Sequence, residues 1–291
     1  MAGAEPESTV RERVVPVVAG GGARAELALV EPTGPVRDVL LWLPALGVTA
    51  RNYLPFAREL AANGVAVALH EWRGAGSSDR RAGRSLDWGY RELLLEDIPA
   101  SRAVLRERYA HATSRIGGHS LGGQLATLVA ALEPADVAGL VLVASGSPYW
   151  RCFGHPWLIR AFYAAVPTIA AACGYFPGRR LGFGGREARG VMTDWSRSGR
   201  SGRYAAEGVA VDLEARLAQV ASPIVALRFA DDWLGPAASL DWLLCKLPAA
   251  PQETVLLDEN DLGNIRADHF SWMKSPGAVV RSIISKININ S

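Results

Sequence analysis

The chain has 291 residues, of which 49% are hydrophobic and 21% charged, and this balance excludes a disordered or fibrous protein. The formal net charge is +2, so the sequence lacks the clustered cations that favour nucleic acid or an anionic membrane as a partner. The three cysteines, Cys152, Cys173 and Cys245, provide neither a disulfide framework nor metal-like spacing. We therefore expect a reducing, cytoplasmic compartment and no bound metal.

Two segments bear on targeting and membranes. The N-terminal MAGAEPESTVRERV has no basic start followed by an apolar stretch, so no signal peptide is expected. Residues 161–176 are the most apolar long segment, but they are too short to span a bilayer and contain Pro167. We expect a buried or substrate-facing helix there and no membrane span, with an interfacial helix as the alternative. The last residues, SIISKININS, differ in composition from the rest and receive no functional weight.

Strands and helices alternate along most of the chain. Two early strands joined by three glycines predict a hairpin, and later continuous apolar strands are typical of a parallel sheet covered on both faces. The first part has predicted strands at 12–18, 24–31, 36–45, 64–72, 114–119 and 139–148, and helices at 51–62, 86–109 and 121–132. The last part has predicted strands at 223–232 and 253–260, and helices at 236–247 and 276–287. The fold class expected is α/β, with a mostly parallel central sheet flanked by helices.

Residues 147–212 interrupt this alternation. We therefore predict a core domain of residues 1–146 and 213–291, with 147–212 inserted as a helical cap or lid. Residues 184–204 are rich in glycine, serine and arginine, which predicts a mobile loop. Aromatic residues of the cap either pack it onto the core or line an apolar substrate pocket: Trp150, Phe153, Trp157, Phe162, Tyr163, Tyr175 and Phe176.

The segment Gly118-His119-Ser120-Leu121-Gly122 lies between a predicted strand and a predicted helix. A serine nucleophile must project from a sharp strand-to-helix turn, and glycines two residues to either side allow the neighbouring chain to approach closely. The helix that follows directs its free N–H groups at the reaction centre. The G-x-S-x-G pattern is weak when isolated, but this placement makes Ser120 the predicted nucleophile.

Where a serine sits on such a turn, an acid and then a histidine follow it in the chain. Of five histidines, only His269 follows the last predicted strand, and it is the predicted general base. Two adjacent carboxylates, Asp231 and Asp232, end the strand after the cap. We favour Asp232 as the acid because such turns usually carry a proline four residues later, here Pro236; Asp231 remains the alternative.

These motifs resemble those of the α/β-hydrolase superfamily, and within it the capped serine hydrolases and esterases. The likeness covers about residues 23–287 and includes WLPALGVTARNY, HEWRGAGSS, GGHSLGG, FADDWLGP and ADHFSW. Many relatives carry His-Gly after the third strand, where this chain has Pro44-Ala45. An oxyanion hole needs backbone N–H groups only, so the resemblance implies Leu46 and Leu121 as donors. In HEWRGAGSS, Arg73, Gly74, Gly76 and Ser78 are expected to shape a loop near the active site.

The predicted function is carboxylic-ester hydrolysis through an acyl-enzyme on Ser120, with no cofactor. The expected partner is a small-molecule ester, and the sequence does not indicate an oligomeric state. The same triad serves thioester, amide or acyl-transfer substrates, or a perhydrolase side reaction. A different class of function, a non-catalytic ligand-binding protein with this fold, would be expected to lose a triad member.

Overall fold

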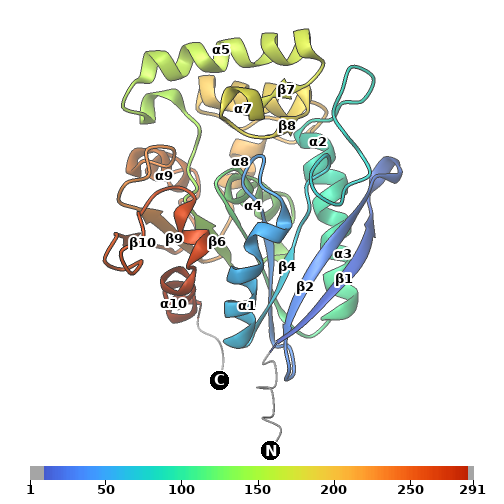
Figure 1. The fold of residues 1–291 in the computed structure, drawn as a ribbon, viewed down its shortest axis with the longest axis vertical. Coiled ribbons are helices and arrows are strands. Elements are labelled where there is room, and N and C mark those ends of the chain that lie inside the picture. The colour runs from blue at the N-terminus through green and yellow to red at the C-terminus, as the bar shows by residue number, and fades with distance from the viewer. Residues whose placement is uncertain (1–9, 288–291) are drawn as a thin grey trace, which may run out of the picture.

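A computed structural model describes residues 10–287 of the chain. Eight strands form one sheet in the order β1-β2-β4-β3-β5-β6-β9-β10 (Figure 1). Strand β2 runs antiparallel to β1 and β4, and the remaining neighbours are parallel. The strands are β1 Val10–Val18, β2 Arg24–Pro32, β3 Asp38–Leu43, β4 Val65–Leu69, β5 Thr113–His119, β6 Leu140–Val143, β9 Ile224–Phe229 and β10 Gln252–Leu257. The expected α/β class with a mostly parallel sheet is confirmed.

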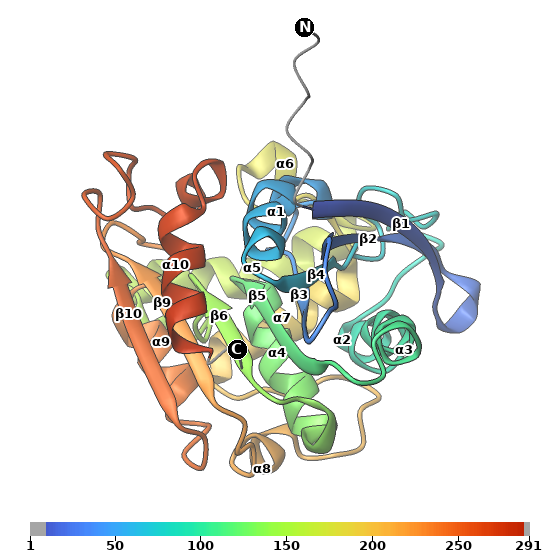
Figure 2. The same cartoon turned by 90° about the horizontal axis from the view of Figure 1, so that it is seen from below.

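Helices cover both faces of this sheet (Figure 2). Helices α1 (Leu54–Ala62) and α10 (Gly277–Lys286) pack on one face, where one cluster of buried apolar side chains includes Phe56 and Val279. The other face carries α3, α4, α8 and α9 over a second cluster that includes Leu125. Their bounds are α3 Ile98–Arg108, α4 Leu121–Leu132, α8 Leu213–Leu217 and α9 Ala237–Leu244. A sheet buried on both sides explains why its central strands are continuous apolar runs.

Most predicted elements differ from the structure only in their ends. The predicted long helix at 86–109 is α2 (Tyr90–Glu92) and α3, joined by a π-helical turn at Leu93–Asp97. Gly20–Gly22 forms the expected turn between β1 and β2, with Gly21 at a φ of 65°. Residues 1–9 and 288–291 lie outside the described residues. The expectations for an absent signal peptide and for the C-terminal tail therefore fall partly outside the structure.

Residues 147–212, the predicted cap, lie above the ends of the central strands (Figure 1). They contain α5 (Pro156–Cys173), α6 (Gly178–Leu181) and α7 (Arg189–Ser201), with a short antiparallel pair formed by β7 (Phe176–Pro177) and β8 (Arg186–Glu187). The prediction of a mobile loop at 184–204 is wrong, because α7 occupies most of it. Val191, Met192 and Trp195 recur on one buried face of α7, a helical pattern hidden by the many polar and small residues around it.

Helix α5 is longer and more exposed than expected. Its buried residues are Tyr163, Val166 and Ala170, so of the two alternatives, a buried or a substrate-facing helix, the first is wrong. The second stays a prediction, and the inner face of the helix borders the cavity described below. The helix has 18 residues with a mean hydropathy of 1.2, and 17% of them are buried. By length and composition alone it could cross a membrane, and it is the one helix among residues 10–287 that meets this criterion.

Candidate active site

Ser120 stands on a sharp turn between β5 and α4. Its backbone has φ 55° and ψ −118°, a conformation that non-glycine residues rarely adopt. A Cβ at Gly118 would collide with the backbone of Gly122, and one at Gly122 would collide with the backbone of Leu43. The carbonyl of Ser120 also accepts a hydrogen bond of 2.7 Å from Ser145 Oγ. The two glycines therefore let the turn close, and the surrounding packing holds the strained serine in place.

The structure brings His269 and Asp232 together. His269 Nδ1 lies 2.8 Å from Asp232 Oδ2, and both side chains are buried. The other carboxylate oxygen, Oδ1, accepts hydrogen bonds of 2.9 Å from the N–H groups of Leu234 and Gly235. All of these contacts fix the carboxylate, so it can hold the imidazole in one orientation, with Nε2 left for chemistry.

The neighbouring Asp231 and the other histidines lie elsewhere. The Asp231 side chain is exposed, although its backbone N–H donates to Ala267 O. His111 is exposed on a loop, and His155 is exposed at the start of α5. His70 is buried and contacts Ser101 Oγ at 2.9 Å. Of the five histidines, His269 is the one the structure pairs with a carboxylate among the described residues.

The two residues predicted to donate to an oxyanion hole, Leu46 and Leu121, line one cavity with Ser120. Leu121 is the first residue of α4, where a helix leaves its N–H groups without intrahelical partners. Leu46 lies on the loop after β3, and both residues line the same cavity as Ser120. The hydrogen bonds found within residues 10–287 include none from the N–H of Leu46 or of Leu121. Both donors are therefore available to a developing negative charge.

The hydroxyl of Tyr53 connects the loop after β3 to His119, whose ring contacts His269. The sequence analysis did not predict this contact. Tyr53 Oη accepts a hydrogen bond of 3.0 Å from Ala45 N and lies 2.9 Å from His119 Nδ1. The His119 ring packs against His269, with ring centroids 4.8 Å apart. Burial, followed by the proximity of His269, lowers the pKa of His119 well below its usual value. His119 therefore stays neutral, and the Tyr53 proton is free to bond its Nδ1. Tyr53 follows Ala45 by eight residues, and this separation matches no motif by which the contact could be predicted from the sequence.

Ser120 and His269 line a cavity of about 430 Å³ between the sheet edge and the cap. Most of its wall is apolar, and Phe153, Phe162 and Tyr163 from the cap take part in it. The other cap aromatics behave differently: Trp150 and Phe176 are buried, Trp157 is exposed, and Tyr175 lies under the Arg186 guanidinium. Some of the cap aromatics therefore line the cavity, and others, Trp150 and Phe176, pack in the core.

One polar group inside the cavity lacks a partner. Gln124 lies one turn beyond Ser120 on α4 and is 6% exposed. Its Oε1 is buried without a hydrogen-bond partner among the described residues. An unpaired buried acceptor is costly to stability, and this oxygen is closed off from the open part of the cavity.

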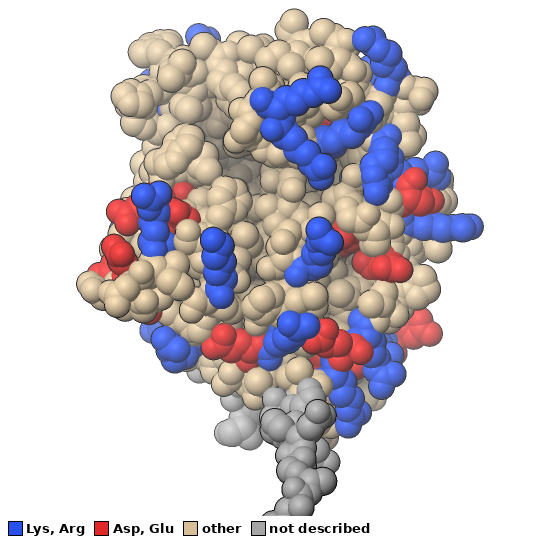
Figure 3. All heavy atoms as spheres, in the orientation of Figure 1, with Lys and Arg blue, Asp and Glu red and all other residues tan. Residues whose placement is uncertain are grey.

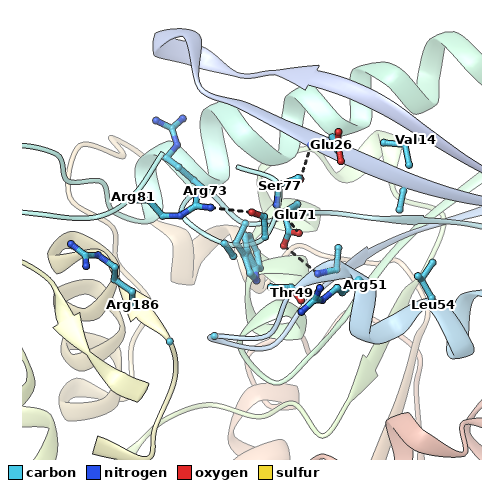
Figure 4. Close-up of a pocket in the computed structure, with 18 of the residues that line it drawn as sticks. Val14, Glu26, Thr49, Arg51, Leu54, Glu71, Arg73, Ser77, Arg81 and Arg186 are labelled. Carbon is cyan, nitrogen blue, oxygen red and sulfur yellow. Dashed lines mark hydrogen bonds between the residues drawn. The ribbon is translucent and has the colours of Figure 1, made fainter. Parts of the chain in front are cut away.

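The loop at 70–78 borders a second cavity, of about 810 Å³ (Figure 4). Figure 4 shows Glu71 at its centre, accepting hydrogen bonds from Ala50 N and Ser77 N. Burial raises the pKa of the Glu71 carboxyl, against the effect of those N–H groups. Trp72 Nε1 donates to Pro44 O at 3.0 Å. The loop therefore does not line the Ser120 cavity; it supports the segment that carries Leu46 from behind.

Comparisons with known proteins bear on the fold of the chain. Residues 34–173, somewhat under half of the chain, match the family model of serine aminopeptidase, S33. No curated protein shows significant sequence similarity to the chain. Similar solved structures include a thermophilic esterase from Thermogutta terrifontis, with 16% identity, a TM-score of 0.60 and coverage of 93% of this chain and 96% of that one.

Two further structures are equally distant in sequence. The esterase domain of a Rhodothermus marinus protein has 18% identity and a TM-score of 0.58, covering 94% of this chain and 95% of that one. A bacterial membrane phospholipase A has 17% identity and a TM-score of 0.59, covering 96% of this chain and 86% of that one. Together with the strand order and the turn at Ser120, these likenesses show that the chain has the α/β-hydrolase fold.

Proposed function

We propose that this chain is a serine hydrolase that cleaves carboxylic esters through an acyl-enzyme on Ser120. The observation that carries the proposal is the convergence of three features on one apolar cavity. Ser120 projects from a strained turn, His269 is held by the buried Asp232, and free N–H groups of Leu46 and Leu121 line the same space. A protein that only binds ligands has no need for all three together.

In this mechanism Ser120 Oγ attacks the ester carbonyl while His269 Nε2 takes its proton. The negative charge that develops on the carbonyl oxygen is stabilised by the two N–H groups. Asp232 stabilises the imidazolium and holds its orientation, and His269 then returns the proton to the leaving alcohol. Water, activated by His269, attacks the acyl-enzyme and releases the acid, which regenerates Ser120.

The apolar cavity supports an ester with a hydrophobic acyl or alcohol part, since its wall offers few polar partners. The names of the similar structures, two esterases and a phospholipase, support the same reaction class for a chain with this fold. A thioester or an amide would use the same residues. Measured rates of ester hydrolysis therefore test whether esters are substrates.

The test is covalent labelling with a fluorophosphonate probe, followed by turnover of p-nitrophenyl esters of increasing chain length. Wild-type protein should label at Ser120 and hydrolyse the esters. Ser120→Ala should lose labelling and about 10³-fold or more of the hydrolysis rate while remaining folded. A folded wild-type protein that neither labels nor hydrolyses any ester would instead favour a ligand-binding protein.

A further inference from the structure

The outer face of α5 is largely apolar, and none of the described residues 10–287 buries it. The residues buried in this helix, Tyr163, Val166 and Ala170, lie on its inner face, where Gly199 of α7 abuts the Tyr163 ring. Exposed residues recur at helical spacing along the other side: Trp157, Ala161, Ala164, Ala165, Thr168 and Ala172. Trp157 is 69% exposed, and Arg160 is the one charged residue of the helix. Such a face is typical of a helix that lies in a membrane interface.

The charged residues of the segment that contains α5 have one sign. No aspartate or glutamate occurs between Asp136 and Glu187, a stretch that includes all of α5. Arg151, Arg160, Arg179 and Arg180 in this stretch are exposed, and the ion pairs found among residues 10–287 include none of them. In Figure 3 the surface at the level of α5 is tan with blue side chains, and red side chains gather lower. The fold thus assembles a cationic rim that the near-neutral sequence does not predict.

The mouth of the Ser120 cavity opens beside this face. Leu158 of α5, Trp233 and Phe270 line that cavity, yet they are 69%, 70% and 42% exposed. Large apolar side chains in contact with water at a cavity mouth are unusual in a soluble monomer and indicate a surface that becomes covered. The covered surface would therefore include the entrance to the candidate active site.

We infer that the outer face of α5 and its arginine rim dock the protein on a bilayer containing anionic lipids, and that the substrates are esters taken from that bilayer. The inference rests on the proposed function for its substrate class, whereas docking itself does not require catalysis. Docked in this way, α5 lies flat in the interface, and the apolar mouth of the cavity faces the acyl chains.

A bilayer fits this face better than the alternatives. If α5 spanned the membrane it would have to leave α7 and expose the Tyr163 contact, including the hydrogen bond from Ser196 Oγ to Tyr163 O. If a second copy covered the face, two sets of arginines would be brought together, and the segment between Asp136 and Glu187 supplies no carboxylate to pair with them. Anionic headgroups supply the missing charge, and each cation near such a surface contributes about a fivefold gain in binding.

The experiment measures sedimentation of the protein with vesicles of phosphatidylcholine, with and without phosphatidylglycerol, in wild-type and Ser120→Ala backgrounds. We expect binding to the anionic vesicles that weakens with salt. Ala165→Glu and the pair Arg179→Gln/Arg180→Gln should each reduce it by about tenfold or more. Val18→Ser and Arg37→Gln remove an exposed apolar side chain and an exposed arginine that lie outside residues 147–212, and should change nothing.

The outcomes separate the two proposals. Turnover of a soluble short-chain ester should be retained in Ala165→Glu, because that side chain points away from the cavity. Wild-type protein that hydrolyses this ester but does not bind anionic vesicles would overturn the docking inference alone. So would self-association that Ala165→Glu abolishes, since a second copy would then be the occupant. Protein that binds vesicles but labels with no fluorophosphonate would overturn the proposed function and the substrate class.

Discussion

Asp231 and Asp232 are adjacent in the sequence, but the fold gives their side chains opposite environments. Asp232 is 4% exposed, and its carboxylate receives three hydrogen bonds when the His269 contact is included. Asp231 points to solvent one residue earlier. Pro236, four residues later, favours Asp232 in the sequence. The physical basis is the turn before Pro236, which directs the N–H groups of Leu234 and Gly235 at that carboxylate. Both aspartates follow the end of β9 at Phe229, so the turn, not the alternation of a strand, separates them.

This separation predicts unequal effects of two conservative changes. Asp232→Asn should lower kcat by about 10³-fold or more, because the amide no longer fixes the imidazole tautomer or stabilises its cation. Asp231→Asn is the matched control and should change kcat by less than about twofold, since surface changes away from a site have small effects. Steady-state kinetics on one soluble ester measures both. Equal, small losses in the two variants would place the acid at another residue.

At the scale of elements, the sequence predicted those with a clear pattern. β5, the turn at Ser120 and α4 were found because glycine spacing and apolar periodicity agree there. Helix α7 was missed because glycine, serine and arginine dominate its composition, and the small residues are what let it approach α5 closely. The contact of Tyr53 with Ala45 and His119 was missed for another reason: His119 is 66 residues away from Tyr53 in the sequence, and no local pattern encodes their pairing.

The close approach of α7 and α5 makes Gly199 critical. A Cβ added there would lie 2.6 Å from the ring of Tyr163, which is 3% exposed and lines the cavity. Gly199→Ala should therefore destabilise the protein by about 1–3 kcal/mol through overpacking, although alanine is the better helix former. It should also slow hydrolysis of long-chain esters more than that of acetates, because the displaced ring narrows the cavity.

Urea unfolding and the ester panel measure these two effects. Gly154→Ala is the matched control, since a Cβ at that cap position meets nothing within 4 Å. If Gly199→Ala were as stable as wild type, the two helices would have room to separate, and their packing would not define the cavity.

At the scale of the whole molecule, buried titratable groups set how stability depends on pH. Burial lowers the pKa of His70 from its ordinary value of 6.5 to about 3, and lowers that of His119 in the same direction. Between pH 6.5 and about 3, His70 binds a proton in the unfolded chain but not in the native protein. The free energy of unfolding therefore falls as the pH falls. Burial raises the pKa of several carboxyl groups, which opposes this trend because the native state is then protonated first. These are Glu71, Asp97, Glu187 and Asp194.

The contribution of His70 to the pH dependence of stability can be separated from that of the other buried groups by comparing the pH profiles of variants. His70→Asn keeps an amide near Ser101 but cannot titrate, so its free energy of unfolding should fall less than that of wild type between pH 6.5 and about 3. The difference should grow by up to about 1.4 kcal/mol for each pH unit in that window. Urea unfolding at successive pH values measures this difference. The slopes of unfolding free energy against pH are compared rather than the absolute stabilities, because the substitution also changes packing.

The control is His111→Asn, which removes an exposed histidine and should follow the wild-type profile. If His70→Asn lost stability in parallel with wild type, the acid sensitivity would have to come from His119 or from elsewhere in the fold.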